Sequence, residues 1–319
     1  MIVRWGLAQA PAVLGDAGID APLLVASARW DRERLPFDAA ARWTEVPSDR
    51  IDDAARLVGD GVVALGGGSA IDLAKAIGAH ASRPVVSIPT TYAGAEWTRY
   101  FGVRDPGRRM RGGGSGAELA GIVYEPRLTL SLARRETVGT AMNALAHAAE
   151  ALYAEGHNAA ADADALEAAR LLARHLPRVV ESPRDLEERT RLLEGAMHAG
   201  RALAGSMLAL GHALAQALGG RYGLPHGALN AICLPAALRF NQAAVPDALG
   251  RLGRALGGDP VARTRELAGL GPFERLRDLG VPREELPDVA AAAVERAGAK
   301  ANPRRVTRDE ATELLLSIW

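Results

Sequence analysis

Three of the seven histidines stand at positions in predicted helices that chance would not favour. Asn143 and His147 lie four residues apart in the helical stretch MNALAHAAEALYA, which places both side chains on one face. His212 belongs to a second helical stretch, LGHALAQALGG, with Gln216 one turn further along the same face. His226 opens a third helix, where the dipole disfavours the protonated imidazole and keeps a ring nitrogen able to bind a metal or accept a hydrogen bond. The other histidines are interpreted as ordinary core or surface residues: His80, His157, His175 and His198.

A glycine triplet between an apolar run and a helical stretch predicts a phosphate-binding turn. Residues 62–79, VVALGGGSAIDLAKAIGA, pass from a buried strand through Gly66, Gly67 and Gly68 into a helix that begins near Ser69. Glycines let backbone N–H groups approach a ligand closely, and the helix directs the positive end of its dipole to the same place. The alternative is a capping box between Ser69 and Asp72, which would only stabilise the start of the helix.

A second polar loop follows the next predicted strand. Residues 83–89, RPVVSIP, form that strand, and the chain continues as TTYAGAE, residues 90–96. Ligands of doubly wound sheets bind beyond the carboxyl ends of the strands. Both the turn 66–69 and the loop 90–94 are expected at such ends.

The elements that position these residues differ between the two halves of the chain. In the first half, predicted strands alternate with helices, which indicates an α/β domain with a doubly wound parallel sheet. The predicted strands are the one before the glycine turn and those at residues 2–6, 22–27, 42–46, 83–89 and 120–124. Long alanine- and leucine-rich helical stretches follow and predict an all-α domain. We place the domains at residues 1–127 and 128–319. The predicted helices of the second half are 136–154, 159–179, 185–205, 207–219, 227–241, 244–256, 283–298 and 307–317.

Residues 104–118, RDPGRRMRGGGSGAE, are predicted to be a loop. Their composition is typical of a solvated flexible segment. The alternative is a cationic flap, in which Arg108, Arg109 or Arg111 pairs with phosphates or with a carboxylate.

Composition excludes several classes of function. Lys plus Arg and Asp plus Glu each number 38, and aromatic residues make up 4% of the 319, so neither a basic surface nor stacking residues favour a nucleic-acid partner. Cys233 is the single cysteine, which excludes an internal disulfide. No apolar run has membrane-spanning length, and the N-terminus lacks the pattern of a signal peptide. We expect a cytoplasmic protein that acts on a small molecule.

The sequence resembles the iron-containing alcohol dehydrogenase family, within the group that includes glycerol dehydrogenase and dehydroquinate synthase, and is most similar to its maleylacetate reductase branch. The similarity spans about residues 60–240, while the first 45 residues are short for the family. The segments that carry it are VVALGGGSAIDLAKAI, SIPTTYAGAEWT, IVYEPRLTL, MNALAHAAEALYA and GHALAQALGGRYGLPHGALNAICLP.

The resemblance implies a nicotinamide cofactor, NAD or NADP, in a cleft between the two domains. It assigns the cofactor to Gly66, Gly67, Gly68, Ser69, Asp72, Thr90, Thr91 and Gly94. An aspartate and three histidines hold Fe²⁺ or Zn²⁺ in the metal-dependent members, and the matching residues are Asn143, His147, His212 and His226. Asparagine replaces the aspartate here and brings a dipole where the family has a charge, which weakens a metal site and fits the maleylacetate reductase branch.

A second departure from the family concerns proton transfer. The family often has a histidine where this chain has Gln216, and glutamine has no titratable proton near neutral pH. The proton must then come from the remaining histidines, from Tyr92 or from water. We therefore assign catalysis to His147, His212, His226 and Tyr92.

The leading hypothesis is hydride transfer between NAD(P)H and a small oxo or enoyl acid. One alternative is a metal-dependent alcohol dehydrogenase in which Asn143 still binds the metal. Another is a non-redox lyase or cofactor-binding protein on the same scaffold, suggested by Gln216 and the short N-terminus. Arg29, which follows the strand ending at Ser27, is a candidate for a 2′-phosphate or an ordinary exposed arginine. A homodimer is expected from the family.

Overall fold

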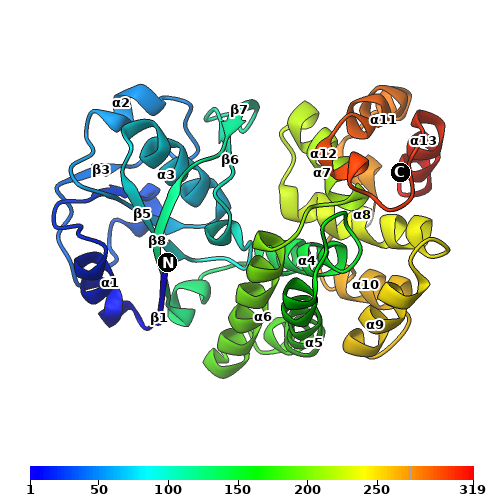
Figure 1. Ribbon diagram of the computed structural model, residues 1–319, viewed down its shortest axis with the longest axis horizontal. Helices are drawn as coiled ribbons and strands as arrows, with labels where there is room; N and C mark the ends of the chain where they lie inside the picture. Colours follow the sequence, from blue (N-terminus) through cyan, green and yellow to red (C-terminus); the bar gives the residue numbers. More distant parts are fainter. Residues whose placement is uncertain (274) are drawn as a thin grey trace. The chain divides into compact units, whose positions relative to one another are not determined.

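The chain folds as two units, Met1–Ser131 and Leu132–Trp319 (Figure 1). The computed structural model describes residues 1–273 and 275–319. Among these residues, no helix has both the length and the apolar character needed to cross a membrane.

The first unit is built on a six-stranded sheet in which every pairing is parallel. The strand order is β1-β8-β5-β4-β2-β3, so that β4 and β5, which precede the two predicted cofactor loops, are neighbours. The predicted parallel α/β architecture is confirmed. The strands are β1 (Ile2–Trp5), β2 (Leu23–Val25), β3 (Ala41–Trp43), β4 (Val62–Gly66), β5 (Pro84–Pro89) and β8 (Glu118–Tyr124).

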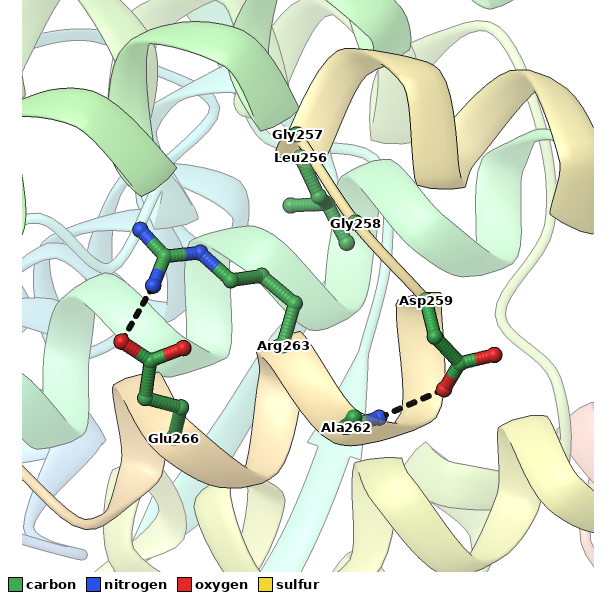
Figure 2. A pocket seen from close by; sticks show the side chains of 7 residues that line it. All are labelled: Leu256, Gly257, Gly258, Asp259, Ala262, Arg263 and Glu266. Atoms are coloured by element: carbon green, nitrogen blue, oxygen red, sulfur yellow. Dashed lines mark hydrogen bonds and ion pairs between the residues drawn. The ribbon is translucent and has the colours of Figure 1, made fainter.

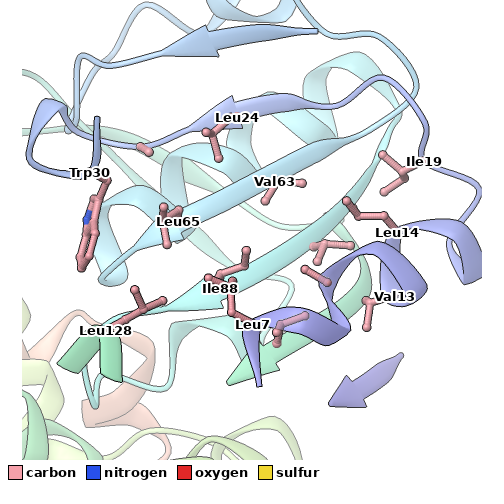
Figure 3. Packing of buried hydrophobic residues seen from close by; sticks show 14 residues of the cluster. Leu7, Val13, Leu14, Ile19, Leu24, Trp30, Val63, Leu65, Ile88 and Leu128 are labelled. Carbon is pink, nitrogen blue, oxygen red and sulfur yellow. The ribbon is translucent and has the colours of Figure 1, made fainter. Parts of the chain in front are cut away.

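Both faces of this sheet are covered, because alternate residues of β4 enter different apolar clusters. Val63 and Leu65 belong to the cluster drawn in Figure 3, where residues of η1 and α1 face the strands. Val62 and Ala64 belong to a second cluster, which includes residues of α2 and α3. These elements are η1 (Leu7–Gln9), α1 (Ala10–Asp16), α2 (Ile51–Ala55) and α3 (Gly68–Ala81), with shorter 3₁₀ turns η2 (Ala28–Trp30), η3 (Ala95–Trp97) and η4 (Pro126–Thr129).

The prediction of a loop over residues 104–118 is wrong for Arg104, residues 110–114 and Glu118, which belong to strands, and holds for the residues between them. Strands β6 (Phe101–Arg104) and β7 (Met110–Gly114) form an antiparallel hairpin. Its glycines allow the close pairing, because a Cβ on Gly113 would lie 2.9 Å from the carbonyl oxygen of Phe101. The turn is tied by Asp105, whose Oδ1 accepts a hydrogen bond from the N–H of Arg109 at 2.9 Å. A glycine run typical of flexibility is here a requirement of strand packing.

All regular elements among the described residues of the second unit are helices, as predicted. The structure adds two elements that were not predicted, α10 (Pro260–Ala268) and η5 (Leu276–Leu279). The predicted helix 283–298 is divided into η6 (Arg283–Glu285), α11 (Leu286–Val294) and α12 (Ala297–Lys300), with Pro287 in the first turn of α11. The helices are α4 (Arg134–Ala151), α5 (Ala159–Glu181), α6 (Leu186–Ala204), α7 (Leu210–Tyr222), α8 (His226–Asn241), α9 (Pro246–Leu256), α10 (Pro260–Ala268), η5 (Leu276–Leu279), η6 (Arg283–Glu285), α11 (Leu286–Val294), α12 (Ala297–Lys300) and α13 (Arg308–Ser317).

Candidate active site

The glycine turn connects β4 directly to α3. Gly67 occupies the N-cap position of this helix and has no side chain with which to cap it. The turn also packs against the second predicted loop: a Cβ on Gly67 would lie 2.7 Å from Cγ2 of Thr91, whereas one on Gly68 would have ordinary contacts. The N–H of Thr90 donates to the carbonyl oxygen of Gly66 at 3.0 Å. The first unit therefore brings the two predicted cofactor loops together at the carboxyl ends of β4 and β5.

The capping box considered for Ser69 and Asp72 does not form. Asp72 instead forms an ion pair with Lys75, with Oδ1 and Nζ 2.9 Å apart, and its Oδ2 accepts a 3.3 Å hydrogen bond from the N–H of Gly102. The N-cap residue of α3, Gly67, has no side chain and leaves the first N–H groups of the helix available to a ligand.

Lys75 is a buried cation that sequence reasoning missed. Its Nζ donates to the carbonyl oxygens of Ala95 at 2.9 Å and Thr98 at 3.3 Å, and also to that of Tyr100. The side chain is 1% exposed, so these oxygens and Asp72 replace its water. Lys75 therefore fixes the segment that continues the second loop. The signal was the three-residue spacing from Asp72.

A buried acid lies in the same segment. Tyr124 donates to Oε1 of Glu96 at 2.8 Å and accepts from the indole N–H of Trp97 at 2.7 Å. Burial raises the pKa of Glu96 above its ordinary value, because a carboxylate loses its hydration there. Burial and the neighbouring Glu96 charge raise the pKa of Tyr124 well above its usual range. These side chains hold η3 against β8.

The remaining loop residues also lie in this part of the first unit. Gly94 has φ of 75°, a left-handed conformation that favours glycine, where it precedes η3. Tyr92 is fully buried, and its hydroxyl donates to Oγ1 of Thr129 at 3.3 Å. Thr129 in turn donates to the carbonyl oxygen of Pro126.

The second unit brings the three predicted histidines together from three helices. The rings of His147, in α4, and His212, in α7, stack with centroids 4.7 Å apart and planes 13° from parallel. The ring of His226, the first residue of α8, lies 5.7 Å from that of His212. Burial, and then the charges of His212 and His226, lower the pKa of His147 well below its ordinary value. His147 is therefore neutral at physiological pH.

Asn230, which sequence reasoning missed, links the remaining members of this cluster. Its Nδ2 donates to Oδ1 of Asn143 at 2.6 Å and lies 3.0 Å from Nε2 of His226, which must accept because an amide nitrogen only donates. Asn230 is completely buried. The signal was its position one helical turn after His226, which puts both side chains on one face of α8.

His212 is held from its other side by Glu150, with Nδ1 and Oε2 2.7 Å apart. Two ring nitrogens in the cluster, Nδ1 of His147 and Nε2 of His212, are buried without a hydrogen-bond partner among the described residues. Unpaired buried polar atoms are rare in folded proteins and often mark a place where a ligand or water binds. The cluster is therefore a candidate site for a reacting oxygen.

Comparisons with known proteins identify the family to which the chain belongs. Residues 137–319 match the model of the C-terminal region of the Fe-containing alcohol dehydrogenase family, and residues 44–119 match the model of iron-containing alcohol dehydrogenase. The maleylacetate reductase of Sphingobium indicum is 39% identical over 276 residues, which cover 85% of this chain and 78% of that protein. The chain belongs to the iron-containing alcohol dehydrogenase family. This membership makes it an NAD(P)-dependent oxidoreductase.

Solved structures of family members extend the similarity over the whole chain. Maleylacetate reductase from Rhizobium sp. strain MTP-10005 is 30% identical, with a TM-score of 0.89 and coverage of 100% of this chain and 95% of that one. The enzyme from Agrobacterium tumefaciens is 29% identical, with the same TM-score and coverage. These likenesses confirm the resemblance to the maleylacetate reductase branch.

The metal that the family name implies does not fit the residues present. Within residues 1–273 and 275–319, no group of three or more His, Cys, Asp or Glu side chains is placed to hold a metal ion. Two atoms matched to metal ligands, Oδ1 of Asn143 and Nε2 of His226, instead accept hydrogen bonds from Asn230. A divalent cation would have to displace this amide without gaining the charge of an aspartate.

Two of the arginines considered for anion binding, Arg111 and Arg29, have other side-chain contacts. Arg111 pairs with Asp105 at 2.5 Å, and Arg108 and Arg109 lie exposed at the hairpin turn. The guanidinium of Arg29 donates to Oγ of Ser131 at 2.7 Å.

A pocket of about 410 Å³ lies where α9 passes into α10 (Figure 2). Its charged groups are paired, because Asp259 accepts from the N–H of Ala262 and Arg263 pairs with Glu266 at 2.5 Å. None of the predicted site residues lines it. We assign it no function.

Proposed function

We propose that this family member is a reductase of the maleylacetate reductase type, which transfers hydride from NADH or NADPH to a small oxo or enoyl carboxylic acid. The observation that carries the proposal is that the three histidines matched to metal ligands lie together, while Asn143, the fourth matched residue, and His226 share the amide of Asn230. This arrangement occurs in a chain similar to several enzymes named maleylacetate reductase.

In this proposal the first unit holds the cofactor. The N–H groups at the start of α3 receive the diphosphate. Gly66 and Gly67 let the turn pack closely against Ala70 and Thr91. Thr90, Thr91 and Gly94 complete the binding surface, while Asp72 acts through Lys75 to hold the adjoining segment. When bound, the nicotinamide supplies the hydride.

The histidine cluster would act on the substrate oxygen. A neutral His147 provides polarity without repelling a cationic neighbour, and Nε2 of His212 is the buried nitrogen available to hold or receive a proton. Asn143 and His226 are oriented by Asn230. We propose His212 or His226 as the source of the proton that accompanies the hydride, and assign Tyr92 to the support of the second loop.

The test is consumption of NADH and NADPH with maleylacetate, followed at the absorbance band of the reduced nicotinamide. We expect one equivalent of cofactor consumed per substrate, and undiminished activity after treatment with a chelator. No consumption with maleylacetate or other small oxo acids would contradict the proposal. Loss of activity on chelation, with recovery on adding Fe²⁺ or Zn²⁺, would favour the metal-dependent alcohol dehydrogenase, and cofactor binding without turnover would favour a non-redox protein.

Three finer points belong to the same proposal. NADP differs from NAD by its 2′-phosphate. If Arg29 releases Ser131 and binds this phosphate, replacing Arg29 by Ala would weaken the binding of NADPH and leave the binding of NADH unchanged. The resemblance supports a homodimer, which sedimentation equilibrium would measure. It also supports a cytoplasmic location, which cell fractionation would test.

A further inference from the structure

Glu150 is a completely buried carboxylate of α4 with three hydrogen-bond donors around it. Its Oε2 accepts from the N–H of Ala209 at 2.7 Å and lies 2.7 Å from Nδ1 of His212. Its Oε1 accepts from the N–H of His212 at 3.2 Å. All three donors belong to the start of α7, so one carboxylate organises the beginning of that helix.

The two backbone contacts make Glu150 the cap of α7. The N-cap residue is Ala209, which has no side chain able to cap. A carboxylate at this place satisfies N–H groups that have no intrahelical partner and lies at the positive end of the dipole. The approach depends on Gly211, because a Cβ there would lie 2.8 Å from Oε1 of Glu150.

The third contact decides where His212 carries its proton. A carboxylate oxygen accepts hydrogen bonds, so the short contact requires the proton on Nδ1. Nε2 is then the atom on the opposite side of the ring, and it is buried without a partner among the described residues. Stacking against His147 fixes the plane of the ring and hence the direction of Nε2.

We propose that Glu150 is a positioning residue that acts through His212: it keeps Nδ1 protonated and directs Nε2 at the reacting oxygen. In the reduction the doubly protonated ring gives its Nε2 proton to that oxygen as the hydride arrives, and the ring is left neutral with its proton on Nδ1. This inference rests on the proposed function and deepens it. Sequence reasoning had identified the histidine but not the glutamate that orients it.

The first test needs no turnover. The protein labelled with ¹⁵N-histidine is studied by NMR, and the His212 signals are assigned by their loss in His212→Gln. We expect the proton on Nδ1 in the wild-type protein, and its loss or transfer to Nε2 in Glu150→Gln. A wild-type His212 without a proton on Nδ1 would overturn the inference. This outcome is independent of whether maleylacetate is the substrate.

The second test separates positioning from a merely structural role. Glu150→Gln should lower kcat by about 10- to 100-fold with a much smaller change in KM, since support of a reacting group is lost. Glu150→Asp keeps the charge and should recover part of kcat. Glu136→Gln, an exposed residue of the same helix, is the matched control and should leave kcat unchanged. Unchanged kcat in folded Glu150→Gln would contradict the proposal.

A double variant tests whether Glu150 acts through the histidine. In the His212→Gln background, Glu150→Gln should lower the remaining kcat by less than about twofold, because residues that act as a unit are not additive. A full additional loss of kcat, with both variants folded by circular dichroism, would show that Glu150 acts independently of His212 and would overturn the inference.

Discussion

The glycine turn of the first unit and the histidine cluster of the second are built by opposite means. The turn uses backbone N–H groups and the absence of side chains, and its contacts join residues near one another in sequence or on adjacent strands. The cluster uses buried side chains from α4, α7 and α8. The turn therefore tolerates little added volume, whereas the cluster depends on each hydrogen bond that orients a ring or an amide.

The largest effect should come from removing the cation that supports the cofactor segment. Lys75→Met leaves three carbonyl oxygens and Asp72 without their partner, so we expect a loss of about 3 kcal/mol in the free energy of unfolding. Urea denaturation measures it. Lys300→Met, which removes an exposed ion pair with Glu295, is the control and should change stability by less than about 1 kcal/mol. Equal losses of stability in the two variants would contradict the structural role of Lys75.

The glycine turn can be filled by a single methyl group. Gly67→Ala places a Cβ against Thr91, and we expect NADH affinity to fall on the order of 100-fold, because the two loops must move apart. Gly68→Ala adds the same methyl group where space exists and should bind NADH nearly normally. Thr91→Ser removes the opposing methyl and should restore part of the binding to Gly67→Ala. Equal binding by both alanine variants would show that packing of the turn is unimportant.

The cluster should respond in turnover rather than in cofactor binding. Asn230→Ala removes the donor shared by Asn143 and His226, and we expect kcat to fall about 10-fold while the Kd for NADH is unchanged. Steady-state kinetics and fluorescence titration give the two values. Gln242→Ala, an exposed residue at the end of the same helix, is the control. A parallel loss of NADH binding would contradict the separation of the two regions.

The smallest effect concerns pH. Burial raises the pKa of Glu96 in the folded protein, so folding favours the protonated acid. This contribution to the free energy of unfolding is fully present below pH 4.5, the ordinary pKa that Glu96 has in the unfolded chain. It is lost as the pH rises through the higher folded pKa, by at most about 1.4 kcal/mol per pH unit. Glu96→Gln removes the titration, and its stability relative to wild type should increase over this window. Unfolding curves at several pH values give the difference in free energy of unfolding between Glu96→Gln and wild type. A difference that does not change with pH would contradict this role of Glu96.

The two regions also differ in how far sequence alone predicts them. The turn 66–69 and its strand follow from a local pattern, and the histidines follow from helical spacing and resemblance. Glu150 and Asn230 were missed because a buried polar residue on a helix has the same spacing as an exposed one, and only tertiary packing reveals its partner. The hairpin at 101–114 was missed because glycine and arginine are typical of loops, although backbone pairing needs no side chains there.

The central claim is that the glycine turn binds the cofactor and the histidine cluster acts on the substrate. The most direct test is His212→Gln, with NADH binding and maleylacetate turnover measured on the same preparation. The account predicts a Kd for NADH within about twofold of wild type and a kcat reduced by at least about 100-fold, since the imidazole acts on the substrate and not on the cofactor. An unchanged kcat, or loss of NADH binding by the folded variant, would contradict it.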